Sequence, residues 1–130
     1  MKKVFLGGIC NGSTWRNRII TMLKIDYFNP VVENWTEECM LEELNQRENS
    51  DFCLYTITPK MTGTYSIAEV TDDSNKRPNK TIFVIMRTDG EKTFTDAQWK
   101  SLKAVEKLVR KNGVSTFDNL KSAANYMNTQ

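Results

Sequence analysis

The residues with the clearest chemical potential are Ser66 and Glu69, three positions apart in the stretch GTYSIAEV (63–70). Ser followed three residues later by Glu is the capping-box pattern, in which both side chains bind free backbone amides at a helix start. The same place would set the carboxylate at the positive end of a helix dipole, which favours its ionised form. An ionised carboxylate can attack an anomeric carbon, as in retaining glycosidases. The pattern alone favours the cap, and the catalytic alternative stays open.

The histidine and cysteine content of the chain limits the kinds of catalysis that it could carry out. The chain has no histidine, which excludes Ser-His-Asp and Cys-His catalysis and most zinc sites. The three cysteines, Cys10, Cys39 and Cys53, are scattered and form no CxxC pair. This favours a reducing, cytoplasmic compartment, and a catalytic thiol at Cys10 is disfavoured because its base is missing. Glutamate chemistry needs neither a metal nor a cofactor, and we expect none.

Composition bounds the class of protein. The 130 residues predict a single domain over 1–130, with 39% hydrophobic and 26% charged residues as in ordinary globular proteins. A net charge of +2 is too small to indicate a nucleic-acid polymer or an anionic membrane as partner. The apolar runs are far too short to span a bilayer. We interpret the basic residues of 100–111 as a solvated helix face, in preference to a partner surface.

Strand-like and helix-like segments alternate along the chain. Apolar runs predict strands, and Asn29-Pro30 interrupts a further extended segment; periodic stripes with Ser13, Thr36, Ser66 and Thr95 as caps predict helices. The expected strands are 3–10, 26–32, 51–58 and 81–86; the expected helices are 13–24, 36–49, 66–76, 95–113 and about 116–128; 87–94 is a turn. This order predicts an α/β three-layer sandwich of the flavodoxin-like or Rossmann-like type, with a parallel sheet of four to five strands and two extra C-terminal helices.

Ligands of such folds bind outside the carboxyl ends of the strands. That rule selects three stretches, GGICNGS (7–13), NPVVENW (29–35) and TPKMTGTYS (58–66). The first is a weak phosphate signal, because it matches neither GxGxxG nor a P-loop. In the second, Trp35 could stack on a base, although burial in the core is favoured. By itself, Glu43 is typical of a solvated helix surface.

Several of these features, in this order, resemble one family. They are VFLGG (4–8), FNPVVENW (28–35), Glu43 placed eight residues before Asp51, and SIAE (66–69). Over about residues 3–86 the chain resembles the nucleoside 2-deoxyribosyltransferase-like family, whose fold is flavodoxin-like. Phe5 stands where some members have tyrosine, and Val70-Thr71 where glycine is frequent.

The resemblance implies a function for the residues expected at the carboxyl ends of the strands. Glu69 would attack C1′ of a 2′-deoxyribonucleoside or nucleotide to form a deoxyribosyl-enzyme, and Glu43 would orient the sugar or handle the proton of the base. A second base or water would then take the sugar. The substrate-binding residues would be Gly7, Gly8, Asn29, Thr62, Thr64 and Ser66. A homo-oligomer that shares sites is possible, and a non-catalytic nucleotide-binding or sensing module of the same fold is the alternative.

Overall fold

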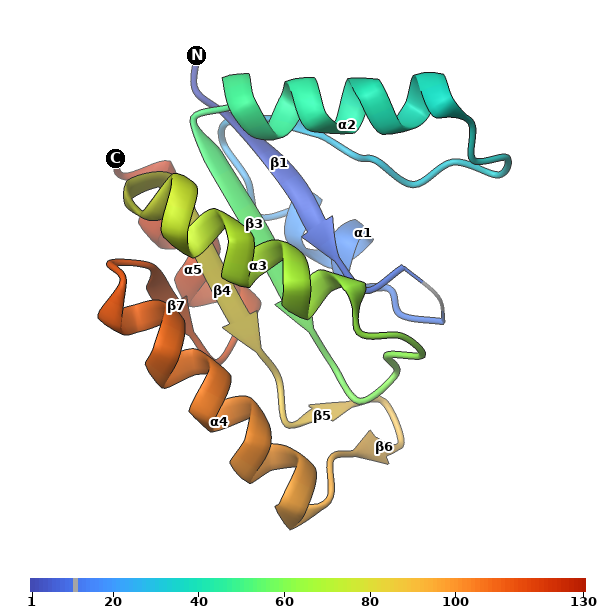
Figure 1. Cartoon of the computed structure of the whole chain (residues 1–130), viewed down its shortest axis with the longest axis vertical. Helices are drawn as coiled ribbons and strands as arrows, with labels where there is room; N and C mark the ends of the chain where they lie inside the picture. Colours follow the sequence, from blue (N-terminus) through green and yellow to red (C-terminus); the bar gives the residue numbers. More distant parts are fainter. Residues whose placement is uncertain (11) are drawn as a thin grey trace.

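The computed structural model describes residues 1–10 and 12–130, and its centre is a parallel β-sheet. The sheet order is β2-β1-β3-β4-β7, and all four neighbouring pairs are parallel (Figure 1). Its strands are β1 (Lys3–Gly8), β2 (Asp26–Phe28), β3 (Phe52–Ile57), β4 (Thr81–Ile85) and β7 (Ser115–Phe117). A separate antiparallel hairpin joins β5 (Thr88–Asp89) to β6 (Lys92–Thr93). The order reverses at β1, the arrangement of a flavodoxin-like fold.

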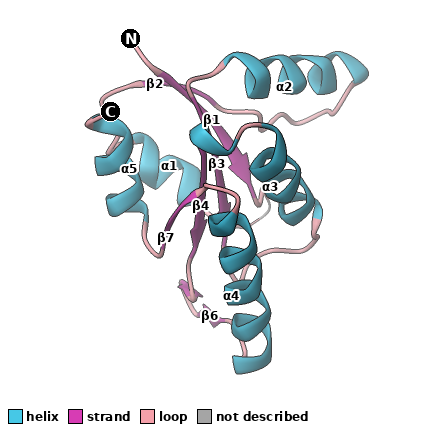
Figure 2. Cartoon of the chain, turned by 60° about the vertical axis from the view of Figure 1, so that its left-hand side comes forward, coloured by secondary structure: helices cyan, strands magenta, loops and turns pink. Residues whose placement is uncertain are grey.

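Helices cover both faces of the sheet. They are α1 (Trp15–Ile20), α2 (Glu37–Asn49), α3 (Tyr65–Lys76), α4 (Asp96–Lys111) and α5 (Leu120–Asn128), with a short 3₁₀ helix at Pro78–Lys80. α1 packs beside α5, and α3 beside α4. Figure 2 shows α1 and α5 on one side of the sheet and α2, α3 and α4 on the other. The predicted three-layer α/β class is therefore confirmed.

The central strands are continuous apolar runs because both of their faces are covered. Every residue of β3 and β4 is buried. Trp15, Phe5, Tyr55 and Phe83 are the largest aromatic side chains with no exposed surface. Burying an aromatic or aliphatic side chain of this size contributes about 1.5–3 kcal/mol. Within the described ranges, no helix is both long enough and apolar enough to cross a bilayer.

Two predicted helix caps are wrong. The backbone oxygen of Thr64 accepts from the amides of Ile67 and Ala68, so α3 starts one residue earlier than predicted and Thr64 is its N-cap. Ser66 is therefore the second helical residue and Glu69 the fifth, and the pair forms no capping box. At α1 the N-cap is Thr14 and not Ser13. The Ser13 hydroxyl donates to Asp89 and accepts from the amide of Trp15 at 3.3 Å.

Other caps follow the sequence closely. Thr36 caps α2 by accepting from the amide of Cys39 at 3.2 Å. Thr95 and Gln98 form the predicted capping box of α4. The C-cap of α4 is Asn112, one residue before Gly113, whose φ of +112° turns the chain away from the helix.

The C-terminal segment holds the main error of the sequence analysis. Residues 115–117, predicted as helix from about residue 116, form the edge strand β7 beside β4. The strand is short and mostly polar, so the sequence has no apolar run there that would predict it. The last helix begins only at Leu120, where the Asn119 side chain accepts from the amide of Ser122 at 2.8 Å. α4 is consequently the connection between β4 and β7, and only α5 lies beyond the sheet.

Candidate active site

A cleft of about 630 Å³ opens at the carboxyl ends of β1 and β3. This is the point where the strand order reverses, and ligands of doubly wound sheets bind at such switch points. Its walls come from the end of β1 with the following loop, Arg16 of α1, the segment 30–35 before α2, one face of α2, the loop that enters α3, and the first two turns of α3. Asn11, part of the predicted glycine-rich stretch, lies outside the described residues.

Glu69 reaches the cleft from the second turn of α3. Its side chain is only 8% exposed, and within the described part of the chain it accepts no hydrogen bond. Burial raises the pKa of Glu69 from its usual value to about 7, the nearby Glu43 adds to this rise, and Arg47 opposes it. Because no described residue donates a hydrogen bond to Glu69, its carboxylate can accept hydrogen bonds from a ligand. The raised pKa means that the ionised form of Glu69 is less favoured than that of an exposed glutamate.

Glu43 faces the same cleft from α2 and is half-buried. Burial raises the pKa of Glu43 above its ordinary value, while the charges of Arg47 and Arg16 oppose the rise. Two carboxyl groups from two helices therefore share one cleft, and Glu43 disfavours ionisation of Glu69. Such paired, perturbed carboxyl groups are typical of sites that combine a nucleophile with a proton donor.

The end of β1 approaches its neighbour too closely for a side chain. A Cβ on Gly8, whose φ is +114°, would lie 2.4 Å from the backbone oxygen of Thr56, and one on Gly7 would lie 2.6 Å from the Tyr55 ring. Both glycines also line the cleft. Close packing of β1 against β3 thus explains them structurally, and it leaves bare backbone at the cleft wall.

The other predicted binding residues separate into two groups. Thr62 and Ser66 line the cleft. Asn29 and Thr64 are not among the described residues that line it; the Asn29 side chain accepts from the amide of Val31 at 3.1 Å, and Thr64 is the N-cap of α3. The two α3 residues, Ser66 and Glu69, therefore come together with the glycines, as the order of motifs predicted.

Apolar side chains surround the mouth of the cleft and are exposed to solvent. The preference for Trp35 as a core residue was wrong, because its side chain is 58% exposed. Exposed apolar neighbours that also line the cleft are Val31, Val32, Met40, Leu44 and Tyr65. A flat aromatic ligand could stack here, since rings such as those of Trp and Tyr offer broad apolar faces.

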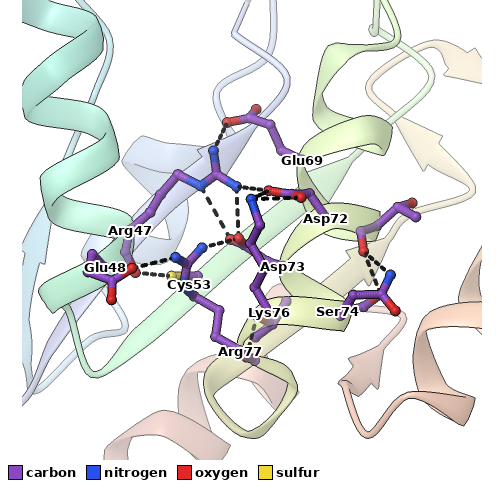
Figure 3. A network of polar contacts seen from close by, with 12 residues as sticks. Arg47, Glu48, Cys53, Glu69, Asp72, Asp73, Ser74, Lys76 and Arg77 are labelled. Atoms are coloured by element: carbon purple, nitrogen blue, oxygen red, sulfur yellow. Dashed lines mark hydrogen bonds and ion pairs between the residues drawn. The ribbon is translucent and has the colours of Figure 1, made fainter.

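Sequence reasoning missed two buried arginines in the cleft wall. Arg16 is 6% exposed, and its guanidinium donates to the backbone oxygens of Leu6, Ile9 and Gly8 at 3.0, 2.5 and 3.2 Å. It therefore ties the loop after β1 to α1. Arg47 is equally buried and pairs with acids of α3 (Figure 3). The sequence did not indicate that either arginine is buried, because an exposed arginine on a helix of this kind gives the same pattern.

The hairpin holds the two loops that carry the site. Asp89 is 5% exposed and accepts from the hydroxyls of Ser13 at 2.6 Å and Thr58 at 2.7 Å, and it pairs with Arg18 at 3.3 Å. Burial alone would raise the pKa of Asp89, but these partners hold it below its usual value. One carboxylate thus links the loop after β1 to the loop after β3.

Fold and site together define a flavodoxin-like α/β protein with a two-carboxylate cleft at its switch point. A family model described as nucleoside 2-deoxyribosyltransferase like matches residues 1–89. The chain therefore belongs to the nucleoside 2-deoxyribosyltransferase-like family. The matched part contains β1 to β5 and every residue that lines the cleft. A search of curated proteins found no match.

Proposed function

We propose that this protein cleaves the N-glycosidic bond of 2′-deoxyribonucleosides or nucleotides and transfers the sugar to a second base or to water. The observation that carries the proposal is Glu69, a buried carboxylate that accepts no hydrogen bond from the described residues and faces a cleft of about 630 Å³. A carboxylate with only a structural task would be hydrogen-bonded at such burial. The family of the chain supports the same chemistry.

In the first step, one carboxylate oxygen of Glu69 attacks C1′ of the sugar. The C1′–O bond forms as the C1′–N bond breaks, and the electron pair of that bond leaves with the base. This step uses the fraction of the protein in which Glu69 is ionised and Glu43 is protonated. Glu43 gives the leaving nitrogen its proton, and burial, which raises the pKa of Glu43, favours the protonated carboxyl that can donate. The product is a deoxyribosyl ester of Glu69.

In the second step, a nitrogen of an incoming base or a water oxygen attacks C1′ from the side the first base left. The ester bond breaks, Glu69 regains its electron pair and carboxylate, and Glu43 accepts the proton that the incoming group loses. The sugar would lie along the bare backbone of Gly7 and Gly8 and near Thr62 and Ser66, with the base against the apolar mouth. The two displacements retain the configuration at C1′.

A chromatographic screen tests the proposal. Purified protein is incubated with each deoxynucleoside and deoxynucleotide, with and without an acceptor base, and the released or exchanged base is measured. We expect turnover that falls by at least about a thousandfold in Glu69→Ala, since a lost nucleophile removes the covalent route. Base release undiminished in that variant would show that Glu69 is not the nucleophile.

The second candidate function is a nucleotide-binding or sensing module without turnover. The observation in its favour is the pKa of Glu69, which burial raises to about 7, so that much of the carboxyl is protonated at neutral pH. A binding module predicts that a nucleoside raises the thermal midpoint of the protein while no free base appears during long incubation. Release of base that depends on Glu69 would rule this candidate out.

A further inference from the structure

Arg47 occupies a buried position between the candidate nucleophile and a cluster of acids on α3. Its Nε and Nη2 atoms lie 3.3 and 2.7 Å from the two carboxylate oxygens of Asp73. The remaining Nη1 atom lies 3.8 Å from Oε2 of Glu69. Figure 3 shows the guanidinium between Glu69 on one side and Asp73 on the other. One edge of this planar group thus contacts Asp73 and the other Glu69, and Nη2 also lies 3.2 Å from Asp72 at the partly exposed side.

Asp73 is itself held by several donors. It has no exposed surface, and besides Arg47 it accepts from the hydroxyl of Tyr55 on β3 and from Nη1 of Arg77 at the end of α3. Donors from α2, β3 and α3 therefore fix one carboxylate. A planar guanidinium bound to it through two atoms has little freedom to rotate.

We propose that Arg47 is a positioning residue, which Asp73 locks so that Nη1 holds the Glu69 carboxylate at the cleft. The catalytic meaning of this inference rests on the proposed function, whereas the contact does not. Without a hydrogen bond from another described residue, Glu69 depends on this ion pair for its orientation. Lysine could not replace Arg47, because a single ammonium group cannot reach both acids in this geometry.

The charged groups around Glu69 come from three helices. Glu43 on α2 and Asp73 on α3 raise the pKa of Glu69, adding to the effect of burial, while Arg47 on α2 and Arg16 on α1 lower it. Arg47 has the larger effect of the two cations. An opposite charge at this distance lowers a carboxyl pKa by about 1–3. Removing Arg47 should therefore make Glu69 harder to ionise.

Arg77 offers a matched control. Both arginines donate to Asp73, but the ion pairs of Arg77 are with Asp73 and Glu48, not with Glu69. The experiment follows the Glu69 carboxyl carbon by ¹³C NMR through a pH titration, with Glu69→Gln to assign the signal. We expect Arg47→Met to raise the titration midpoint by about one to three pH units. Arg77→Met should leave the midpoint where it is in the unmodified protein.

A second variant protects the test against misfolding. Arg47→Met leaves Asp73 with less compensation in the core, so the double variant Arg47→Met/Asp73→Asn removes both buried charges. Its midpoint should still exceed that of the unmodified protein, because Arg47 lowers the pKa of Glu69 more than Asp73 raises it. An unchanged midpoint in these variants, or an equal rise in Arg77→Met, would overturn the inference.

Measuring turnover alongside the NMR titration distinguishes a failure of this inference from a failure of the proposed function. If the protein releases base, the acidic limb of kcat/KM against pH should move upward in Arg47→Met and stay in place in Arg77→Met. An acidic limb that does not move in Arg47→Met would contradict the positioning role. If no base is released while the NMR midpoint rises as expected, the Arg47 contact stands and the proposed function fails.

Discussion

Replacing Glu69 with glutamine should stabilise the protein above neutral pH. Glutamine has nearly the same shape but never ionises, so the variant avoids placing a charge in the buried position that Glu69 occupies. In the unfolded chain a glutamate has a pKa of about 4.3, whereas burial raises the pKa of Glu69 in the folded protein to about 7. The folded state therefore holds the proton more tightly than the unfolded state does.

The sign and size of the effect follow from this difference. Between about pH 4 and pH 7 the unfolded state releases its proton first, so the stability of the unmodified protein falls as pH rises. Each unit of pKa difference corresponds to about 1.4 kcal/mol, which gives roughly 3–4 kcal/mol over the whole interval. The advantage of Glu69→Gln should be near zero at about pH 4 and reach roughly 3 kcal/mol at about pH 8.

Urea unfolding at a series of pH values measures this directly. The free energy of unfolding is obtained for the unmodified protein, for Glu69→Gln and for Glu91→Gln, a control with the same change at an exposed position of the hairpin. The Glu91→Gln curve should run parallel to that of the unmodified protein. If the Glu69→Gln curve also runs parallel, or lies below at about pH 8, then the folded protein does not disfavour a charge on Glu69 and the reasoning is wrong.

Two further predictions concern the frame of the cleft. Gly8→Ala should destabilise the protein by at least about 2 kcal/mol, because φ is +114° and the new Cβ would meet backbone atoms of β3. Gly63→Ala, where a Cβ meets nothing within 4 Å, is the control in urea unfolding; equal losses would contradict this packing. Asp89→Ala should cost about 3 kcal/mol or more, since it leaves two hydroxyls without their charged acceptor. Asp96→Ala, which removes an exposed aspartate paired with Arg87, should have little effect in thermal melts, and a similar drop in both variants would refute the linking role of Asp89.

The predictable part of the fold was the part with strong local patterns. Residues 51–58 and 81–86 are the largely apolar runs typical of a strand covered on both faces. Thr95 and Gln98 form a helix cap through local contacts alone. β7 could not be found in this way, because three polar or aromatic residues become a strand only through their pairing with β4. Tertiary pairing overrides weak local preference at such edges.

The site was predictable to the extent that it follows from strand order. Glu69 and Glu43 reach one cleft because the segments that carry them follow strands at the same sheet edge. Asp73 and Asp89 were missed because their importance lies in partners that are distant in sequence: Asp73 binds Arg47 from α2, and Asp89 binds Ser13, 76 residues away. No periodicity or spacing within one segment encodes such contacts.

The charges of the cleft bear on which transition state it could stabilise. Arg16 donates to three backbone oxygens, and Arg47 pairs most closely with Asp73, so both cations are largely compensated by their own partners. The two carboxyl groups, Glu43 and Glu69, accept no hydrogen bond from the described residues. The charge that the cleft offers a ligand when Glu69 is ionised is therefore negative. Cleavage of an N-glycosidic bond develops positive charge on the sugar ring, and fixed negative charge beside that ring lowers the energy of the transition state more than that of the neutral ground state.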